Sequence, residues 1–330
     1  MSDLLLAQSV TALIDERPYL EDFFAALGLS PPGNGTPLAR FLRQVPAERL
    51  AEFSLDHDQL IAQCLAFIER MEKFGNERPE AVRRVTVKAG LDKDGRREQH
   101  DLHLECGEVV AIVGPTGSGK SRLLADIECL AQRDTPSGRQ VLLDGGLPDE
   151  EKRLGGEHQL VAQLSQNMNF VMDVTVAAFL RLHAESRLVT DIEGCIDRIF
   201  RTAVALAGEP FTRKTPITSL SGGQSRALMI ADVACLSSSP IVLIDEIENA
   251  GVDRHRALEL LVQKEKIVLI ATHDPLLALT AGRRVVIANG AILAILVTTN
   301  GERQRCDELR TIETRLHGLR ERIRAGERIA

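Results

Sequence analysis

A glycine-rich octapeptide about one third of the way along the chain is suited to holding phosphate groups. It reads GPTGSGKS over residues 114–121, after the apolar run 109–113 and before a stretch with helical apolar spacing. This order predicts a strand, a glycine loop and a helix, and the spacing is typical of loops that bind nucleotide phosphates. The glycines let backbone N–H groups turn toward oxyanions, and the helix N-terminus adds positive potential. The predicted nucleotide-binding residues here are Gly114, Pro115, Thr116, Gly117, Ser118, Gly119, Lys120, Ser121 and Arg122.

Two side chains of this loop have separate predicted tasks. Lys120 is expected to reach the β- and γ-phosphates, and the hydroxyl of Ser121 is expected to ligate Mg²⁺. Two adjacent acids, Asp245 and Glu246, end the buried apolar run 241–244 and supply a further carboxylate beside the phosphates.

The elements around the loop predict an α/β fold. Short apolar strands at 160–164, 241–244 and 267–270 alternate with helical stretches at 174–208 and 220–236, as in a mainly parallel sheet. Alternating residues at 85–87 and 101–105 predict further strands ahead of the loop.

The first 78 residues read as a separate helical domain. Ser9 is a candidate helix cap, Gly28 a candidate helix end, and the charged stretch 69–79 a linker. Residues 9–14, Pro18 and residues 27–29 distantly resemble a small helical domain fused to redox and metal-handling proteins. The alternative is a helical bundle that docks a partner protein and is specific to the family of this chain. Domains are thus expected at 1–78 and 82–298, followed by a helical tail at 299–330.

Composition limits the partners and the compartment. The 330 residues are 44% hydrophobic and 26% charged, with a formal net charge of −7, which argues against nucleic-acid surfaces. Six scattered cysteines indicate reduced thiols, and neither a signal peptide nor an apolar stretch of ~18 residues is found. We therefore expect a cytoplasmic protein without a membrane insertion of its own, associated with a membrane only through a partner. His100, His103 and Cys106 are three apart, but on a strand that spacing sends neighbours to opposite faces, so no metal site is expected there.

The pentapeptide LSGGQ at 220–224, between the glycine loop and Asp245, resembles a signature of the ATP-binding cassette (ABC) ATPases. The resemblance covers about residues 82–298. Gln166, nine positions before Thr175, resembles the Q-loop glutamine, and His273 resembles the switch histidine. The resemblance implies a P-loop NTPase with a mainly parallel core sheet, an antiparallel β subdomain and a helical signature subdomain, preceded by a small all-α domain.

The resemblance also implies roles for the catalytic residues. Asp245 would hold Mg²⁺ through water, Glu246 would be the general base, and His273 would hydrogen-bond the γ-phosphate. Gln166 would contact Mg²⁺ and the attacking water, with Gln163 as the rival candidate by spacing.

A second set of residues would act on the ATP of a partner subunit. By resemblance it comprises Ser221, Gly222, Gly223, Gln224 and, in the D-loop, Asp253. One chain carries both half-sites, so a homodimer with two ATP molecules at its interface suffices.

Three features depart from the family pattern. The region in which the family usually carries an adenine-stacking aromatic residue, near residues 85–88, has no aromatic ring, so Val87 or an aliphatic neighbour is expected to pack on the purine instead. Ile247 replaces the usual proline, and the D-loop 250–253 comes one position late. The stretch from Asp253 to His273 is also short.

Two functions follow from these observations. The first is a soluble mechanochemical ATPase that remodels or activates a protein client, such as a metalloenzyme during maturation. The second is the cytoplasmic ATP-binding subunit of a membrane transporter.

Overall fold

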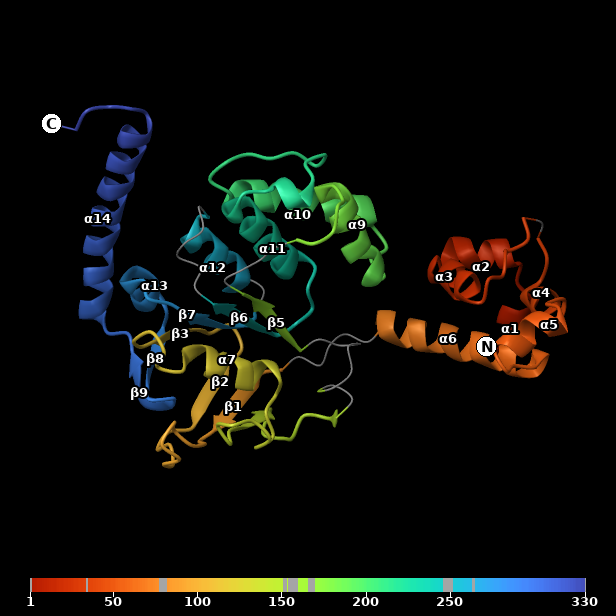
Figure 1. Ribbon diagram of the computed structural model, residues 1–330, viewed down its shortest axis with the longest axis horizontal. Helices are drawn as coiled ribbons and strands as arrows, with labels where there is room; N and C mark the ends of the chain where they lie inside the picture. The colour runs from red at the N-terminus through yellow and green to blue at the C-terminus, as the bar shows by residue number, and fades with distance from the viewer. Residues whose placement is uncertain are drawn as a thin grey trace. The chain divides into compact units, whose positions relative to one another are not determined.

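The chain divides into two compact units, residues 1–77 and 78–330. The computed structural model describes residues 2–33, 35–76, 82–150, 153, 160–165, 170–245, 252–262 and 265–329. Figure 1 shows both units, each of which is described here by itself.

The first unit is all-helical. Its helices are α1 (Ser2–Ala7), α2 (Val10–Glu16), α3 (Tyr19–Ala26), α4 (Leu38–Arg43), α5 (Ala47–Glu52) and α6 (His57–Asn76). Ser9 caps α2 by accepting from the N–H of Ala12 at 3.2 Å, as predicted. The helices enclose a core of their own, in which the largest fully buried side chains are Leu13, Leu20, Phe24, Leu38, Leu42, Leu60 and Ile68.

The second unit is built on a six-stranded sheet of order β5-β6-β7-β3-β8-β9. The strands are β5 (Val161–Leu164), β6 (Ile241–Asp245), β7 (Ile267–Ala271), β3 (Val109–Val113), β8 (Arg283–Ala288) and β9 (Ala291–Val297). Neighbours pair in parallel up to β8, and β9 closes the edge antiparallel to β8. A separate antiparallel sheet contains β2 (Leu102–Glu105), β1 (Arg84–Lys88) and β4 (Gln140–Leu143). The mainly parallel core and the antiparallel subdomain predicted from the sequence are thus confirmed.

Helices cover both faces of the parallel sheet (Figure 1). On one face lies α7 (Lys120–Glu128), together with the antiparallel sheet. On the other lie α9 (Val176–Ser186), α10 (Ile192–Leu206), α11 (Gly222–Cys235) and α12 (Arg254–Val262); a 3-10 turn η1 (Ile217–Ser219) precedes α11. Helix α13 (Pro275–Thr280) follows β7, and the long helix α14 (Asn300–Arg324) ends the unit.

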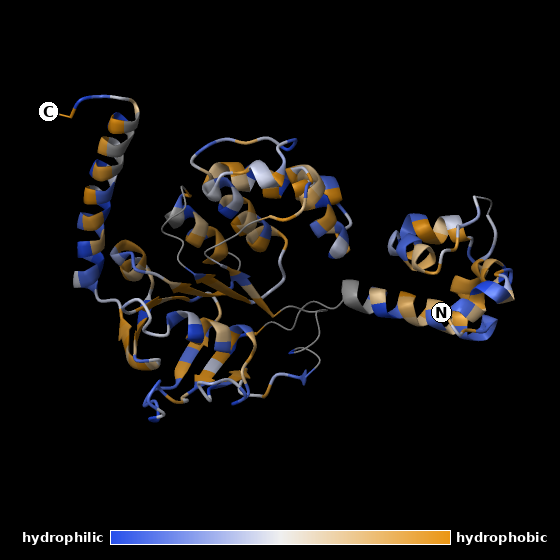
Figure 2. Cartoon of the chain, in the orientation of Figure 1, coloured by the Kyte–Doolittle hydropathy of each residue, from blue (hydrophilic) through white to orange (hydrophobic). Residues whose placement is uncertain are grey.

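The apolar runs of the central strands divide between two cores. In β6, Val242 and Ile244 belong to the core under α9–α12, whereas Ile241 and Leu243 belong to the core under α7 and the antiparallel sheet. Successive side chains of a strand point to opposite faces, so a strand buried on both faces is apolar throughout. Figure 2 shows these strands as continuously hydrophobic and the covering helices as two-sided.

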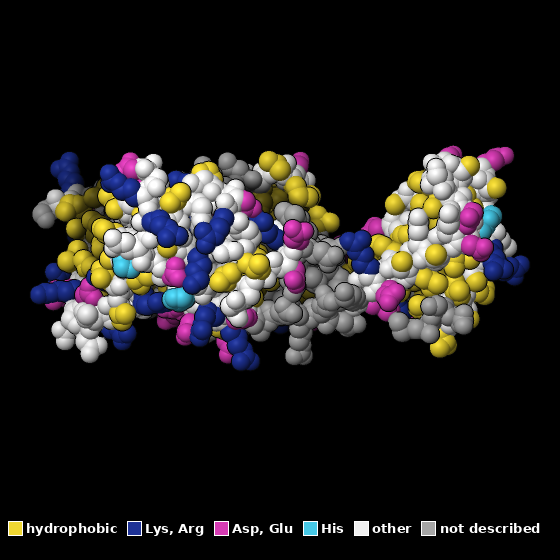
Figure 3. Space-filling model, turned by 90° about the horizontal axis from the view of Figure 1, so that it is seen from below, with side chains coloured by type: hydrophobic (Ala, Val, Ile, Leu, Met, Phe, Trp, Pro, Cys, Tyr) yellow, Lys and Arg dark blue, Asp and Glu magenta, His cyan; other side chains and the backbone are white. Residues whose placement is uncertain are grey.

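The antiparallel sheet carries a charged outer surface. A shallow hollow on it is lined by Arg83, Arg84, Lys88 and His103, with Asp144 among its acidic neighbours. Figure 3, which views the second unit from this side, shows Lys and Arg side chains interspersed with Asp and Glu. Charges of both signs are the pattern of a solvated surface.

Candidate functional site

The glycine loop of residues 114–119 lies where β3 passes into α7. Strand β3 lies between β7 and β8, both parallel to it, so its carboxyl end opens at the middle of the sheet edge. Gly114 and Gly119 adopt φ angles of 153° and 109°. A Cβ on Gly119 would lie 2.8 Å from the Cα of Gly290, and one on Gly114 would lie 2.3 Å from the carbonyl oxygen of Ile287. Only glycine fits at these two positions, because both the backbone angle and the space exclude a side chain.

Lys120 begins α7 and turns back into the loop. Its ammonium donates to the carbonyl oxygens of Gly114 at 3.0 Å and Pro115 at 3.3 Å. It also lies 3.0 Å from Nε2 of His273, which comes two residues after the end of β7. The structure therefore brings together the lysine and the histidine that the sequence assigned to one phosphate site.

Ser121 and Asp245 meet beside this lysine. The Ser121 hydroxyl donates to Oδ2 of Asp245 at 3.3 Å, across two strand intervals of the sheet. A hydroxyl and a carboxylate are oxygen ligands of the kind Mg²⁺ prefers, so the donor set fits that ion. The predicted residues Gln166 and Glu246 lie outside the described residues.

Gln163, the rival of Gln166, lies elsewhere. With its amide oriented so that the nitrogen faces the carboxylate, the Gln163 side chain donates to the two oxygens of Glu128 at 2.9 and 2.6 Å. Glu128 is the last residue of α7 and Lys120 is the first, so about 12 Å of helix separates the two ends. The alternative assignment of Gln163 is therefore wrong, because its strand delivers the side chain to the far end of the helix.

Ser221 and Gln224 form the start of α11. The Ser221 hydroxyl accepts from the Gln224 N–H at 3.3 Å, and the Gln224 side chain accepts from the Ser221 N–H at 2.9 Å. This capping box fixes the helix N-terminus. Gln224 also donates to the carbonyl oxygen of Pro210 at 3.2 Å. Within the described residues, the hydrogen bonds of these two side chains stay inside their own subdomain, and Ser221 and Gly222 are exposed.

Asp253 lies at the start of α12. Its carboxylate accepts from the N–H of Arg256 at 3.1 Å, and its own N–H donates to the carbonyl oxygen of Leu206 at 3.0 Å. The side chain borders a hollow between α12, α13 and α14, and not the glycine loop of its own subunit.

The loop after β1 reaches the glycine loop and was missed from the sequence. The Lys93 ammonium donates to the carbonyl oxygen of Gly117 at 2.5 Å, and its backbone N–H donates to Asn289 at 2.9 Å. Leu91, in the same loop, is 38% exposed, whereas Val87 is only 1% exposed. The expectation that Val87 packs on a purine is thus wrong, because its side chain is in the core between the sheets. A turn was predicted at 93–95, but no pattern indicated which loop it would touch.

A buried cluster of charged side chains is linked to the glycine loop by hydrogen bonds through Gly290. Arg139 is fully buried and donates to both carboxylate oxygens of Glu98 at 2.9 and 2.5 Å, and to Asp126 of α7 at 2.9 Å. It also donates to the carbonyl oxygen of Gly290 at 2.7 Å, and the N–H of Gly290 donates to Ser118 in the glycine loop at 2.6 Å. Burial alone would raise the pKa of Glu98, but the hydrogen bonds from Arg139 and from backbone N–H groups outweigh it and lower that pKa.

The residues considered for a transition metal have other contacts. His103 Nδ1 is 3.1 Å from the hydroxyl of Thr86, and the Cys106 thiol donates to the carbonyl oxygen of Glu265 at 2.8 Å. Within the described ranges, no three His, Cys, Asp or Glu side chains are grouped as metal ligands.

Comparisons with known proteins identify the family. A family model described as ABC transporter matches residues 98–249. An ABC transporter ATP-binding protein of Methanocaldococcus jannaschii is 49% identical over 249 residues, which cover 75% of this chain and 95% of that protein. The chain belongs to the ABC ATPase family. It is accordingly an ATP-binding protein and an ATP hydrolase.

ABC proteins of lower identity match about three fifths of this chain. The zinc import ATP-binding protein ZnuC of a Ruegeria species is 29% identical over 59% of this chain and 72% of that protein. The macrolide export ATP-binding/permease protein MacB of Psychrobacter cryohalolentis is 31% identical over 60% of this chain, but the match spans only 30% of MacB.

Solved structures share the fold. An ATP-binding subunit of an ABC transporter is 22% identical with a TM-score of 0.51, covering 70% of this chain and 99% of its own. CbiO1 of Clostridium perfringens, part of the ABC transporter complex CbiONQ, is 21% identical with a TM-score of 0.52. The match covers 71% of this chain and 96% of CbiO1. In the described part of this ABC ATPase, none of the helices combines the length and the apolar character needed to cross a bilayer.

Proposed function

We propose that this ABC ATPase works as a head-to-tail homodimer that couples the binding and hydrolysis of Mg·ATP to conformational work on a partner protein. The observation that carries the proposal is the meeting of Lys120, His273, Ser121 and Asp245 at the carboxyl ends of three neighbouring strands. Four groups suited to phosphate and Mg²⁺ converge there from segments up to 153 residues apart.

Each residue has a defined task in this proposal. Lys120 binds the β- and γ-phosphates, and the backbone N–H groups of the glycine loop bind the remaining oxyanions. Ser121 and Asp245, with Gln166, would hold Mg²⁺, which neutralises charge on the phosphate oxygens. Glu246 accepts the proton of the attacking water, and His273 donates to the γ-phosphate as negative charge develops.

The second half of each site comes from the other copy. Gly222 and Ser221 are exposed at the N-terminus of a 14-residue helix, which favours an approaching phosphate. Within the described residues, the side chains of Ser221 and Gln224 form hydrogen bonds with each other and with Pro210 rather than with the glycine loop of the same subunit, which supports their use across a two-fold axis.

Glu246→Gln tests this dimer directly. The variant keeps the nucleotide contacts but loses the proton acceptor, so with Mg·ATP it should elute from a sizing column as a dimer. The unchanged chain without nucleotide, loaded well below about 1 µM, supplies the monomeric reference. A Glu246→Gln chain that hydrolyses ATP at the wild-type rate would exclude Glu246 as the base.

The partner proposed first is a permease subunit of a membrane transporter. The relatives named above are described as ATP-binding proteins for transport, for zinc import and for macrolide export, which supports this choice. In this role the protein is held at the cytoplasmic side of a membrane by its partner.

A soluble client, including a metalloenzyme under maturation, is the second candidate. The specific observation in its favour is the first unit, which has its own buried core and precedes an ATPase unit that contains the described site residues. That unit would be the docking module for the client.

Affinity capture distinguishes the two partners. Full-length Glu246→Gln bait and a bait starting near Glu80 would be compared on detergent-solubilised membranes and on the soluble fraction. A permease retained by both baits supports transport. A soluble protein retained only by the full-length bait supports the client function.

A further inference from the structure

Helix α14 leaves a stripe of apolar side chains uncovered. Its first turns are anchored: Cys306 is 5% exposed and lies 3.7 Å from the hydroxyl of Thr280 in α13, and Glu302 pairs with Arg284. Farther along, four apolar residues are strongly exposed, namely Ile312 at 60%, Leu316 at 44%, Leu319 at 38% and Ile323 at 60%. Figures 1 and 2 show this part of α14 extending past α13 with hydrophobic residues along it.

The spacing of these four residues, here called the α14 seam, is that of a coiled coil. They follow one another at intervals of four, three and four residues, which is the alternation of the a and d positions of a heptad. A helix that covers a globular core shows a wider apolar stripe than this two-per-heptad line. The narrow stripe, set among charged neighbours such as Arg315 and Arg322, therefore indicates a single partner helix.

We propose that the α14 seam pairs, in antiparallel orientation, with the α14 seam of a second copy of this chain. The order Ile-Leu-Leu-Ile with intervals of four, three and four is symmetric about the point midway between Leu316 and Leu319. An antiparallel pair would therefore set Ile312 opposite Ile323 of the other copy, and Leu316 opposite Leu319. Such self-complementarity is what a two-fold contact between identical surfaces requires.

The charge distribution along α14 favours the same orientation. In the proposed register, the positions that flank the seam place Glu313 beside Arg320 of the other copy, which is attractive, and Arg315 beside Arg322 of the other copy, which is repulsive. Parallel packing would place Glu308 beside Glu313 of the other copy and Arg315 beside Arg320 of the other copy, so both flanking pairs would repel.

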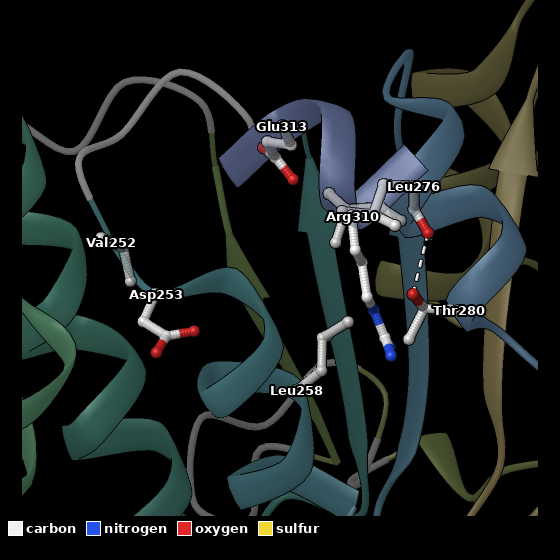
Figure 4. A pocket seen from close by; sticks show the side chains of 8 residues that line it. Val252, Asp253, Leu258, Leu276, Thr280, Arg310 and Glu313 are labelled. Carbon is white, nitrogen blue, oxygen red and sulfur yellow. Dashed lines mark hydrogen bonds between the residues drawn. The ribbon is translucent and has the colours of Figure 1, made fainter. Parts of the chain in front are cut away.

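The position of α14 connects the seam to the proposed ATP-dependent interface, so this inference rests on the proposed dimer. A hollow of about 220 Å³ is bordered by Asp253 at the start of α12, by Leu276 and Thr280 of α13 and by Arg310 and Glu313 of α14 (Figure 4). Asp253 is the D-loop residue expected to act across the subunit interface. Helix α14 thus lies next to that segment and can pair about the same two-fold axis.

The surface that the paired α14 seams bury is small, so we expect a weak and reversible dimer contact. Standard interfaces use roughly 20–30 residues a side, and a seam of four residues with its flanks supplies far fewer. We therefore expect dissociation at micromolar concentrations, about 1–50 µM. A tether of this strength keeps two subunits together when the ATP sites open, and raises the effective concentration for closing them again.

Sedimentation of the full chain without nucleotide tests the pairing. We expect a monomer–dimer equilibrium, and Leu316→Asp should raise the dissociation constant at least about tenfold because it places a charge in the seam. Thr314→Asp is the matched control: it adds the same charge on the same helix, about 200° around from Leu316, and should leave the dimer unchanged. Circular dichroism and ATP binding would verify that both variants fold.

Cysteine cross-linking tests the orientation in a background with the exposed Cys106 and Cys129 replaced by serine. A mixture of Ile312→Cys and Ile323→Cys chains should form a disulfide dimer. Neither variant alone should do so, because in an antiparallel pair position 312 lies about 16 Å from its counterpart, far beyond disulfide reach.

Several results would overturn the proposal. These are a monomer at about 100 µM, a dimer unaffected by Leu316→Asp, and efficient cross-linking of either single-cysteine variant. A monomer that binds lipid vesicles through the seam would assign it to a membrane surface instead. Lys120→Ala should keep the nucleotide-free dimer, so a failure of the proposed ATP-dependent interface is distinguishable from a failure of this one.

Discussion

Arg139→Met should be among the most damaging single substitutions in the second unit. Arg139 is fully buried, and its guanidinium makes two hydrogen bonds to Glu98, one to Asp126 and one to the carbonyl oxygen of Gly290. Methionine fills much of the volume but leaves two buried carboxylates without their cation. Breaking a buried ion pair by removing one partner costs about 3–5 kcal/mol, a large share of a total stability of about 5–15 kcal/mol.

The loss should also reach the nucleotide site. Gly290 is held by Arg139 at its carbonyl oxygen, and its N–H donates to the carbonyl oxygen of Ser118 in the glycine loop. Without the guanidinium, the turn at Gly290, which contacts the glycine loop, loses one of its hydrogen bonds. We therefore expect ATP affinity to fall even under conditions in which the variant remains folded.

Urea denaturation separates the second unit from the first. The chain has no Trp and a single Tyr, Tyr19, so tyrosine fluorescence reports the first unit while far-UV circular dichroism reports both. Arg84→Met is the control, because its ion pair with Glu105 is exposed and long at 3.6 Å, and exposed pairs contribute less than about 1 kcal/mol. A loss below about 1 kcal/mol for Arg139→Met would refute the reasoning, since it would place the cluster in the same class as a surface pair.

Three further predictions follow from the site and its supports. Lys120→Ala should weaken ATP binding, because it removes the cation paired with the β- and γ-phosphates; an unchanged affinity in a titration would exclude the assigned loop. Discrimination between ATP and GTP should stay below about a hundredfold, or ~2.7 kcal/mol, since the exposed Leu91 offers apolar contact that reads little of a base edge; competition assays measure the ratio. Hydrogen bonds from Arg284 and Thr299 lower the pKa of Glu302 to about 2, so the stabilisation from this carboxylate is present above its unfolded pKa of about 4.3 and is lost as the pH falls through 2. Thermal melts of Glu302→Gln should therefore depend less on pH than those of the unchanged chain in that window, and parallel curves would contradict the assignment.

The parts of the site that follow a strong local pattern were predictable from the sequence. The glycine loop, Lys120 and Ser121 are contiguous, and His273 and Asp245 each follow an apolar run that could only be a buried strand. Parallel strands bring their carboxyl ends to one edge, so the meeting of these residues followed from the strand assignments.

Features that depend on the exact course of a strand, or on residues far away in the sequence, were not predictable from the sequence. Gln163 and Gln166 differ by three residues, and only the course of β5 shows that Gln163 faces Glu128. Val87 lies on β1, in which Val85, Thr86 and Val87 are all buried, so no alternation in the sequence shows that its side chain belongs to the core. Arg139 reads as a surface charge in the sequence, because Glu98 lies 41 residues away from it. The α14 seam has a heptad pattern, but only the structure shows that α13 covers the start of the helix and leaves the seam exposed.

The central claim is that each ATP site is completed by the partner's Ser221–Gln224 segment, and mixed dimers test it most directly. Lys120→Ala disables the glycine loop of its own chain. Gly222→Asp places a negative charge at the exposed start of α11, where an added Cβ would meet no atom within 4 Å outside its own helix turn, so we expect the fold to be kept. Each variant alone should be inactive. Mixed in equal amounts, about half of the dimers combine both chains and contain one intact site of two, so about a quarter of the wild-type ATPase rate should return. A mixture no more active than its two components would contradict the shared site and would indicate that each chain hydrolyses ATP with its own Ser221–Gln224 segment.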